Sequence, residues 1–170
     1  NHYILYILSF CFLSNISLGQ NILEEKLIYR GNLAFHQESD EPVTGIVISK
    51  YETGETKEKG EYVDGLREFE WKEFHQNGTV KSTINYKNGF KEGPFEIYFE
   101  DGKIKALGNY VKGLEDGNWQ EFSNEGNFLY IGNYNQGNLN GRWQTFHLNG
   151  RLFSMGNFIE GKKEGLWEYF

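Results

Sequence analysis

The chain has 170 residues, of which 17% are aromatic and 21 are glycine, and its formal net charge is −7. This length suffices for one domain or one repeat array, and the aromatic content excludes an intrinsically disordered chain. The acidic balance argues against sequence-independent nucleic-acid binding and against docking by charge on an anionic membrane, because both depend on exposed Lys and Arg.

The first segment, residues 1–19, is apolar and contains no Lys, Arg, Asp or Glu. Ser17 and Gly19 place small residues at the −3 and −1 positions of a signal-peptidase site before Gln20, which predicts a signal peptide and export to the periplasm, cell surface or exterior. The segment lacks an initiator Met and a basic n-region, so the simplest interpretation is a fragment that starts inside the signal. A buried strand and a membrane anchor are the alternatives.

The only cysteine, Cys11, lies in this segment. A lipoprotein site needs a small residue before the Cys, and Phe10 stands there, so lipidation is the less favoured alternative. Removal of the signal would leave a chain without cysteine, which excludes disulfides and Cys metal sites.

From Gly45 onward the sequence repeats every 24 residues without insertion or deletion. We therefore divide the chain into a lead-in, residues 20–44, with a first strand, and a repeat array, residues 45–170, with five full units and a partial sixth. Three columns of the repeat are predicted structural positions. One holds every Trp of the chain: Trp71, Phe95, Trp119, Trp143 and Trp167. The second holds Tyr62, Tyr86, Tyr110, Tyr134 and Phe158, and the third holds Gly78, Gly102, Gly126 and Gly150.

Within a unit, residues such as Phe128, Tyr130 and Tyr134 alternate with Leu129 and Ile131, which is the period of a strand. The dipeptides Asn77-Gly78, Asp101-Gly102 and Asn149-Gly150 are typical of hairpin turns. One unit is thus a strand, a hairpin turn, a strand and a Gly-x-x-x-Gly connection. The predicted fold is all-β: an elongated antiparallel meander in a single twisted sheet, advancing about 10 Å per unit.

Two features of the unit stay open. Gly108, Gly132 and Gly156 lie inside strands, where we expect a ring of the Trp or the Tyr column to cover each glycine. Trp119 and Phe122 are three residues apart, so either both faces carry aromatic rings or a bulge redirects one of them.

The unit "GPFEIYFEDGKIKALGNYVKGLEDG", from Gly93, resembles the bacterial MORN-repeat variant of the YwqK-type antitoxin family. The resemblance extends over residues 29–170 and implies an elongated sheet of hairpins that binds a partner protein and performs no catalysis. It defines no binding residues. The departures are Val47 in place of Trp, Phe69 in place of Gly, and Leu129 and Phe153 in place of Lys.

No motif for catalysis, metal or cofactor binding is present, so we expect no enzyme and no cofactor. His75 and His147 share a column but lie three units apart, too far for a common metal. Acidic residues precede most connection glycines, which favours turn chemistry; a carboxylate ladder for a cation or basic partner is the alternative. These residues are Glu68, Glu92, Asp116 and Glu164.

The predicted function is an exported, non-catalytic interaction scaffold that binds another protein, with an antitoxin-like neutraliser as one case. The alternative is a cell-envelope carbohydrate binder that stacks sugars on exposed Trp and Tyr rings. A hydrolase lacks the residues it would need. The final "GLWEYF" starts a sixth unit, so its strand is an open edge that either continues in more chain or meets a partner. The binding face and the oligomeric state stay open.

Overall fold

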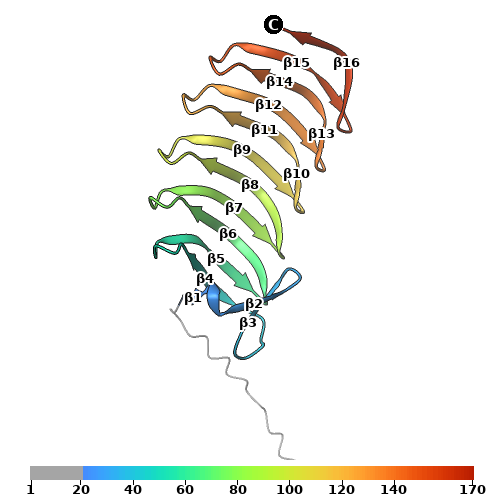
Figure 1. The fold of residues 1–170 in the computed structure, drawn as a ribbon. Coiled ribbons are helices and arrows are strands. Elements are labelled where there is room, and N and C mark those ends of the chain that lie inside the picture. The colour runs from blue at the N-terminus through green and yellow to red at the C-terminus, as the bar shows by residue number, and fades with distance from the viewer. Residues whose placement is uncertain (1–20) are drawn as a thin grey trace, which may run out of the picture.

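A computed structural model describes residues 21–170, and the predicted signal segment with Cys11 lies outside these residues (Figure 1). Within them the chain is almost entirely β-strand, which confirms the predicted all-β class. The elements are β1 (Ile22–Leu23), η1, a 3₁₀ turn (Glu24–Lys26), β2 (Leu27–Arg30), β3 (Leu33–His36), β4 (Gly45–Lys50), β5 (Thr56–Val63), β6 (Leu66–Phe74), β7 (Val80–Lys87), β8 (Phe90–Tyr98), β9 (Ile104–Val111), β10 (Leu114–Glu115), β11 (Gly117–Phe122), β12 (Phe128–Asn135), β13 (Asn138–Leu139), β14 (Gly141–Phe146), β15 (Leu152–Ile159) and β16 (Lys162–Tyr169).

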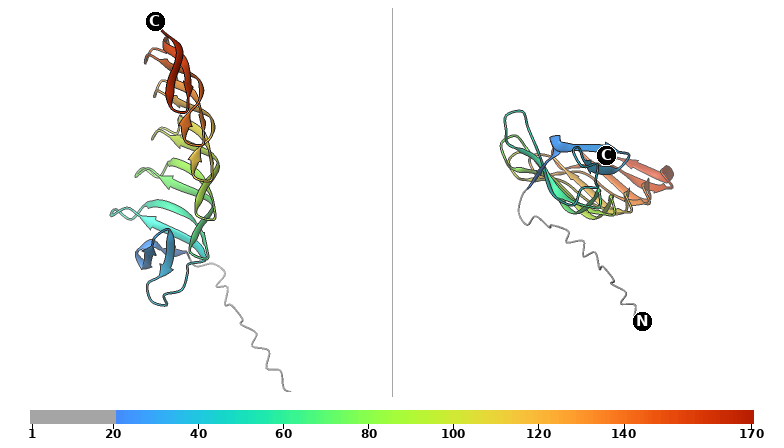
Figure 2. Two further views of the ribbon diagram at one scale, coloured as in Figure 1. Left: turned by 90° about the vertical axis from the view of Figure 1, so that its right-hand side faces the viewer. Right: turned by 90° about the horizontal axis from the view of Figure 1, so that it is seen from below.

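The strands from β4 to β16 pair with their chain neighbours in one long antiparallel sheet. The short β10 and β13 pair with β9 and β12, just before β11 and β14 join the same ladders. Among the strands of residues 21–170, only β1 pairs in parallel, with β4. The views in Figure 2 show an elongated, twisted and curved sheet, which confirms the predicted meander.

Two kinds of hairpin alternate along this meander. At Asn77-Gly78, the His75 N–H donates to the Thr79 carbonyl at 2.8 Å, closing a three-residue loop in which only the glycine has positive φ. The connection between units is a second hairpin: Lys87 pairs with Phe90 across Asn88 and Gly89, whose φ values are 51° and 79°. Two successive positive φ angles define a type I′ turn. The Gly-x-x-x-Gly connection is therefore a two-residue turn followed by a strand.

A β-bulge recurs at one step of each full unit. The register shifts between Ser49 and Lys50 in the first hairpin and at the equivalent step in each of the four following hairpins. The last of these shifts lies between Thr145 and Phe146. In the fourth unit the bulge sets Phe122 opposite Phe128, with ring centroids 4.8 Å apart. The extra residue of the bulge is Leu129 on β12, so β11 keeps its alternation and Trp119 and Phe122 lie on opposite faces. Of the two options for these residues, the structure has aromatic rings on both faces.

The lead-in segment packs onto the first unit of the sheet. It was expected to contain one strand, and residues 21–44 hold three short ones. The Ala34 N–H donates to the Gly65 carbonyl, and the Gly65 N–H donates to the Val43 carbonyl, both at 2.8 Å. Val43 and Ala34 are fully buried beside Tyr62 and Trp71. The hairpin β2–β3 therefore covers the first unit and supplies part of its core.

Candidate functional site

The Trp column lies over the glycines inside the strands. A Cβ added to Gly108 would lie 2.5 Å from the Trp119 ring, and Gly60, Gly132 and Gly156 face Trp71, Trp143 and Trp167 in the same way. Of the two columns that were candidates for this cover, the Trp column provides it. The Tyr column packs edge-on against the Trp rings, as Tyr110 does against Trp119 at 5.4 Å and 88°.

Phe95 replaces Trp at the place where the strand glycine that a Trp would cover is also replaced. Ile84 stands in the glycine column and Phe95 in the Trp column, and the two are direct partners across β7 and β8. A smaller ring thus faces a larger aliphatic side chain. The smaller ring makes room for part of the larger aliphatic side chain, so the two substitutions compensate in direction, as a packed core requires.

Cationic side chains cover the outer ends of several rings. The Arg67 guanidinium lies 3.9 Å from the Trp71 ring centroid and makes two hydrogen bonds to the Glu58 carboxylate, at 2.8 and 2.9 Å. Lys91, in the same column, lies 4.7 Å from the Tyr110 ring. Such cation–π contacts add to the burial of the rings.

The two aromatic columns are therefore packed among themselves, while the turn glycines Gly78, Gly102 and Gly126 have open space around them. Trp71 is 4% exposed and Trp119 is 7% exposed, and Tyr62, Phe95 and Tyr110 are also buried. Trp143 and Trp167 are half-buried. A buried ring offers no flat surface to a sugar, so the rings in the middle of the array contribute to stability rather than to stacking with a ligand.

The acidic column caps the two-residue turns. The Glu92 carboxylate accepts a hydrogen bond from the Lys112 N–H at 2.7 Å, and Glu68 accepts one from the Asn88 N–H at 2.5 Å. Asp116 accepts a longer one from the Gln136 N–H at 3.4 Å. Each carboxylate thus binds the turn of the following unit, which is the turn chemistry expected for this column.

The rings of His75 and His147 take part in packing and hydrogen bonding. The Nε2 of His75 lies 3.0 Å from the Tyr98 carbonyl, and the His147 ring packs edge-on against Phe153 at 4.9 Å. Within residues 21–170 no group of three or more His, Cys, Asp or Glu side chains is placed to hold a metal ion. The same part of the chain has no helix long and apolar enough to cross a membrane.

An apolar strip at the edge of the two-residue turns was not among the predicted sites. Phe90 is 55% exposed and rests on the turn of the next unit, since a Cβ on Gly113 would lie 3.5 Å from its ring. Leu114 is 48% exposed and lies against Gly137 in the same way, and Val111 beside it is also exposed. Phe90 and Leu114 share one register of the repeat, with Leu66. The 24-residue period could therefore have revealed the column, although not its exposure.

Phe69 is the second feature that the sequence did not assign. It occupies the column of Gly93, Gly117, Gly141 and Gly165 and shares their positive φ, at 59°. A bulky side chain in this left-handed region is strained by about 1 to 2 kcal/mol. Its ring is nevertheless 58% exposed, so burial offsets little of that strain.

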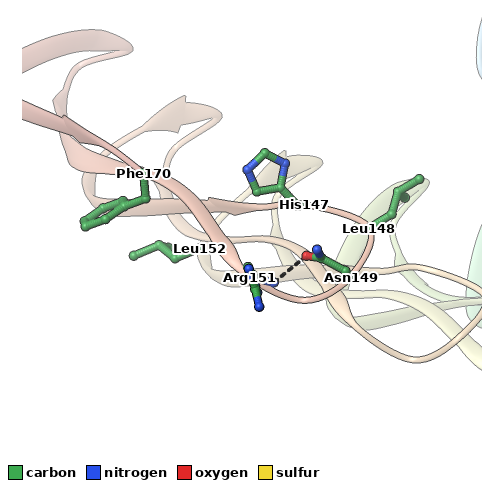
Figure 3. A pocket seen from close by; sticks show the side chains of 6 residues that line it. All are labelled: His147, Leu148, Asn149, Arg151, Leu152 and Phe170. Atoms are coloured by element: carbon green, nitrogen blue, oxygen red, sulfur yellow. Dashed lines mark hydrogen bonds between the residues drawn. The ribbon is translucent and has the colours of Figure 1, made fainter.

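A shallow hollow of about 740 Å³ lies at the three-residue loop of the fifth unit (Figure 3). Figure 3 shows His147, Leu148, Asn149, Arg151, Leu152 and Phe170 around it. Its polar groups are loop side chains that do not converge on one point, so the hollow lacks the arrangement of a catalytic site.

Comparison with solved structures finds weak similarities. A crystal structure of a mutant S. aureus TarM in complex with Fondaparinux, alpha-GlcNAc-glycerol and UDP matches at 14% identity and a TM-score of 0.35, covering 55% of this chain and 19% of that chain. A second crystal structure of TarM gives the same identity and TM-score over 57% and 19%. A crystal structure of the GtfA/B complex bound to UDP and GlcNAc matches at 10% identity and a TM-score of 0.26, over 78% and 23%. This chain thus spans about a fifth of the length of those proteins, and scores this low carry no argument about function.

Comparison with family models finds the MORN repeat variant at residues 67–88 and 91–112. Each matched segment contains one hairpin with a three-residue loop, formed by β6 and β7 in the first and by β8 and β9 in the second. No curated protein matches the chain. The two adjacent units in the middle of the array are therefore matches to the MORN repeat variant.

Proposed function

We propose that this chain is a non-catalytic repeat scaffold that binds another protein through the edge formed by its two-residue turns. The exposed strip of Phe90, Val111 and Leu114 carries this proposal. Exposed aromatic and aliphatic side chains that gather on an otherwise polar surface are typical of protein-binding sites. The match of two units to the MORN repeat variant supports a binding role over a catalytic one.

The geometry of the edge supports binding of a folded partner. The turns are held rigidly, because each turn glycine donates its N–H to a carbonyl of the preceding unit, as Gly113 does to Lys91 at 2.8 Å. Carboxylates such as Glu92 fix the same turns from the side. A surface that is ordered before binding loses little conformational entropy when a partner covers it.

Two finer parts of the proposal rest on the sequence. Export follows from the apolar residues 1–19 and the small residues at Ser17 and Gly19. A role as an antitoxin-like neutraliser follows from the resemblance to the YwqK-type repeat family. In that case the partner is a toxin whose active surface the turn edge covers.

The experiment is affinity capture from cell-envelope extracts with the full chain as bait, followed by purification of the captured protein and calorimetric titration. The Phe90→Ser and Leu114→Ser double variant should weaken the measured affinity at least about tenfold, the size expected for central interface residues. Leu148→Ser is the matched control, since Leu148 is also exposed but lies in a three-residue loop at the other end of the strands. The control should bind like the original chain.

Two results would contradict the proposal. Capture of polysaccharide alone would favour the carbohydrate-binding alternative over a protein partner. Equal affinity of the double variant and the control would remove the turn edge as the binding surface, even with a protein partner in hand.

A further inference from the structure

Two of the three-residue loops carry the same Asn-Gly dipeptide on the same backbone but hold the asparagine differently. Gly78 donates its N–H to the His75 carbonyl at 2.9 Å, and Gly150 donates to the His147 carbonyl at 2.8 Å. Both asparagines, Asn77 and Asn149, are exposed at the loop tip. The two loops therefore share their backbone hydrogen bonds and differ in the contacts of the asparagine side chain.

The Asn77 carboxamide is held on both of its ends. Its Oδ1 accepts a hydrogen bond from the Thr79 N–H at 2.9 Å and lies 2.6 Å from the Thr79 hydroxyl, whose single proton is shared with the Glu100 carbonyl at 3.1 Å. Its Nδ2 donates to the Glu100 carbonyl in the next unit at 3.3 Å. These three contacts fix the side-chain torsions of Asn77.

The Asn149 carboxamide is held by one contact in the described part of the chain. Its Oδ1 accepts a hydrogen bond from the Arg151 N–H at 3.1 Å, which Figure 3 marks with a dashed line. Arg151 occupies the register of Thr79 but has no hydroxyl to add a second bond. The Asn149 side chain can therefore rotate at lower cost than that of Asn77.

We propose that Asn149-Gly150 is a site of spontaneous deamidation, and that Thr79 protects the equivalent Asn77-Gly78. In the reaction the Gly150 amide nitrogen loses its proton and attacks Cγ of Asn149. The N–Cγ bond forms, the Cγ–Nδ2 bond breaks, and the nitrogen leaves as ammonia. Water then opens the cyclic imide at either carbonyl, which yields Asp or isoAsp.

The backbone cost of this step is common to the two loops, since each glycine N–H must leave its carbonyl partner. Within the loop, the difference lies in freeing the carboxamide oxygen, which takes one hydrogen bond at Asn149 and two at Asn77. Glycine on the C-terminal side leaves the attacking nitrogen sterically open in both loops. Two further Asn-Gly pairs are outside the comparison because they have other backbone surroundings: Asn88-Gly89 lies in a two-residue turn, and Asn140-Gly141 lies at the start of β14.

The fold can accommodate the Asp product. Asp101 occupies the same register in the third unit, and its carboxylate accepts a hydrogen bond from the Lys103 N–H at 3.1 Å. Conversion of Asn149 to Asp therefore adds one negative charge to the loop edge and keeps the hairpin. The isoAsp product lengthens the loop backbone by one methylene and disturbs this hydrogen bond.

The test is incubation of the purified full chain at mildly alkaline pH, followed by peptide mapping that separates Asn, Asp and isoAsp at each site. We expect Asn149 to deamidate about fivefold faster than Asn77, given the net contribution of one hydrogen bond. Thr79→Val should accelerate the loss of Asn77, and Arg151→Thr should slow the loss of Asn149. Unchanged circular dichroism would show that both variants keep the hairpins.

Equal rates at the two sites, or a faster reaction at Asn77, would overturn the proposal. Rates that differ in the original chain but do not respond to Thr79→Val or Arg151→Thr would overturn it as well, because the protecting contact would then lie elsewhere. The measurement requires no partner and is independent of the binding function proposed above.

Discussion

Ile84 and Phe95 are direct partners across β7 and β8, at the two positions where the other units pair glycine with Trp. A Trp ring needs glycine at the position that it lies over, as Trp71 lies over Gly60, whereas its ladder partner on the other side, across β6 and β7, is Ile84 itself. A side chain at the covered position needs a smaller ring above it. The residue in the glycine column thus limits the size of the ring in the Trp column, and the reverse also holds.

The first prediction concerns Gly108, which lies between two rings. A Cβ at this position would lie 2.5 Å from Trp119 and 2.7 Å from Phe95, so Gly108→Ala forces at least one ring to move. The free energy of unfolding should fall by about 1 to 3 kcal/mol, as for other overpacked cores. Chemical denaturation measures it, with the exposed Lys105→Ala as a control that should change stability by less than about 0.5 kcal/mol.

The second prediction concerns the coupling of Ile84 and Phe95. Phe95→Trp alone should destabilise the sheet because the larger ring meets Ile84, and Ile84→Gly alone should destabilise it by leaving a cavity. The double variant recreates the Gly–Trp pair found elsewhere in the array. Its loss of unfolding free energy should therefore be smaller than the sum of the two single losses by about 0.5 to 3 kcal/mol. Additive losses in a double-mutant cycle would show that the two columns are independent.

The third prediction concerns the backbone strain at Phe69. Phe69→Gly and Phe69→Ala both remove the ring, but only Gly is free of strain at a φ of 59°. The free energy of unfolding of the Gly variant should therefore be about 1 kcal/mol larger than that of the Ala variant. Equal stabilities of the two variants would mean that the strand relaxes to another backbone conformation once the ring is gone.

The fourth prediction concerns alkaline pH. Burial, followed by the charge of Glu121, raises the pKa of Tyr130 to about 12, and burial also raises the pKa of Tyr110 and of Tyr134. An unfolded tyrosine has a pKa of about 10, so the unfolded chain loses the proton first as the pH rises. The stability from neutral Tyr130 is present in full below pH 10 and should be lost between about pH 10 and pH 12.

Phenolate absorbance and circular dichroism, recorded along one alkaline titration, measure this loss. Tyrosines in the aromatic columns should ionise together with the loss of strand signal. Tyr130→Phe removes one of the ionising groups and should shift the unfolding midpoint to higher pH. Ionisation of all tyrosines near pH 10 with the sheet intact would contradict the buried placement of these rings.

The exposed strip at the turn edge is a feature whose column the sequence predicts but whose exposure it does not. The period places Leu66, Phe90 and Leu114 in one column, but a strand buries or exposes a given register according to what covers it. Phe90 lies against Gly113 of the next unit, and no local sequence pattern predicts that contact. The same limit applied to Phe69, which the sequence marked as a departure without revealing its strain.

The lead-in was harder to predict than the array because it does not repeat. Its hairpin is held by hydrogen bonds such as that from Ala34 to Gly65, between residues far apart in the chain. The period supplies no copy of these contacts from which to infer them. In the array, by contrast, each unit repeats the contacts of its neighbours, and the columns could be assigned roles before the strands were placed.

The sequence by itself determined the all-β class, the 24-residue unit and the turn positions, because alternation and turn chemistry are local properties that the period repeats. Only the tertiary structure decided that the Trp column covers the strand glycines, and that carboxylates such as Glu92 cap the turn of the next unit. These contacts join strands of adjacent units, and their geometry follows from the register and curvature of the sheet. Neither quantity is specified by any one stretch of chain.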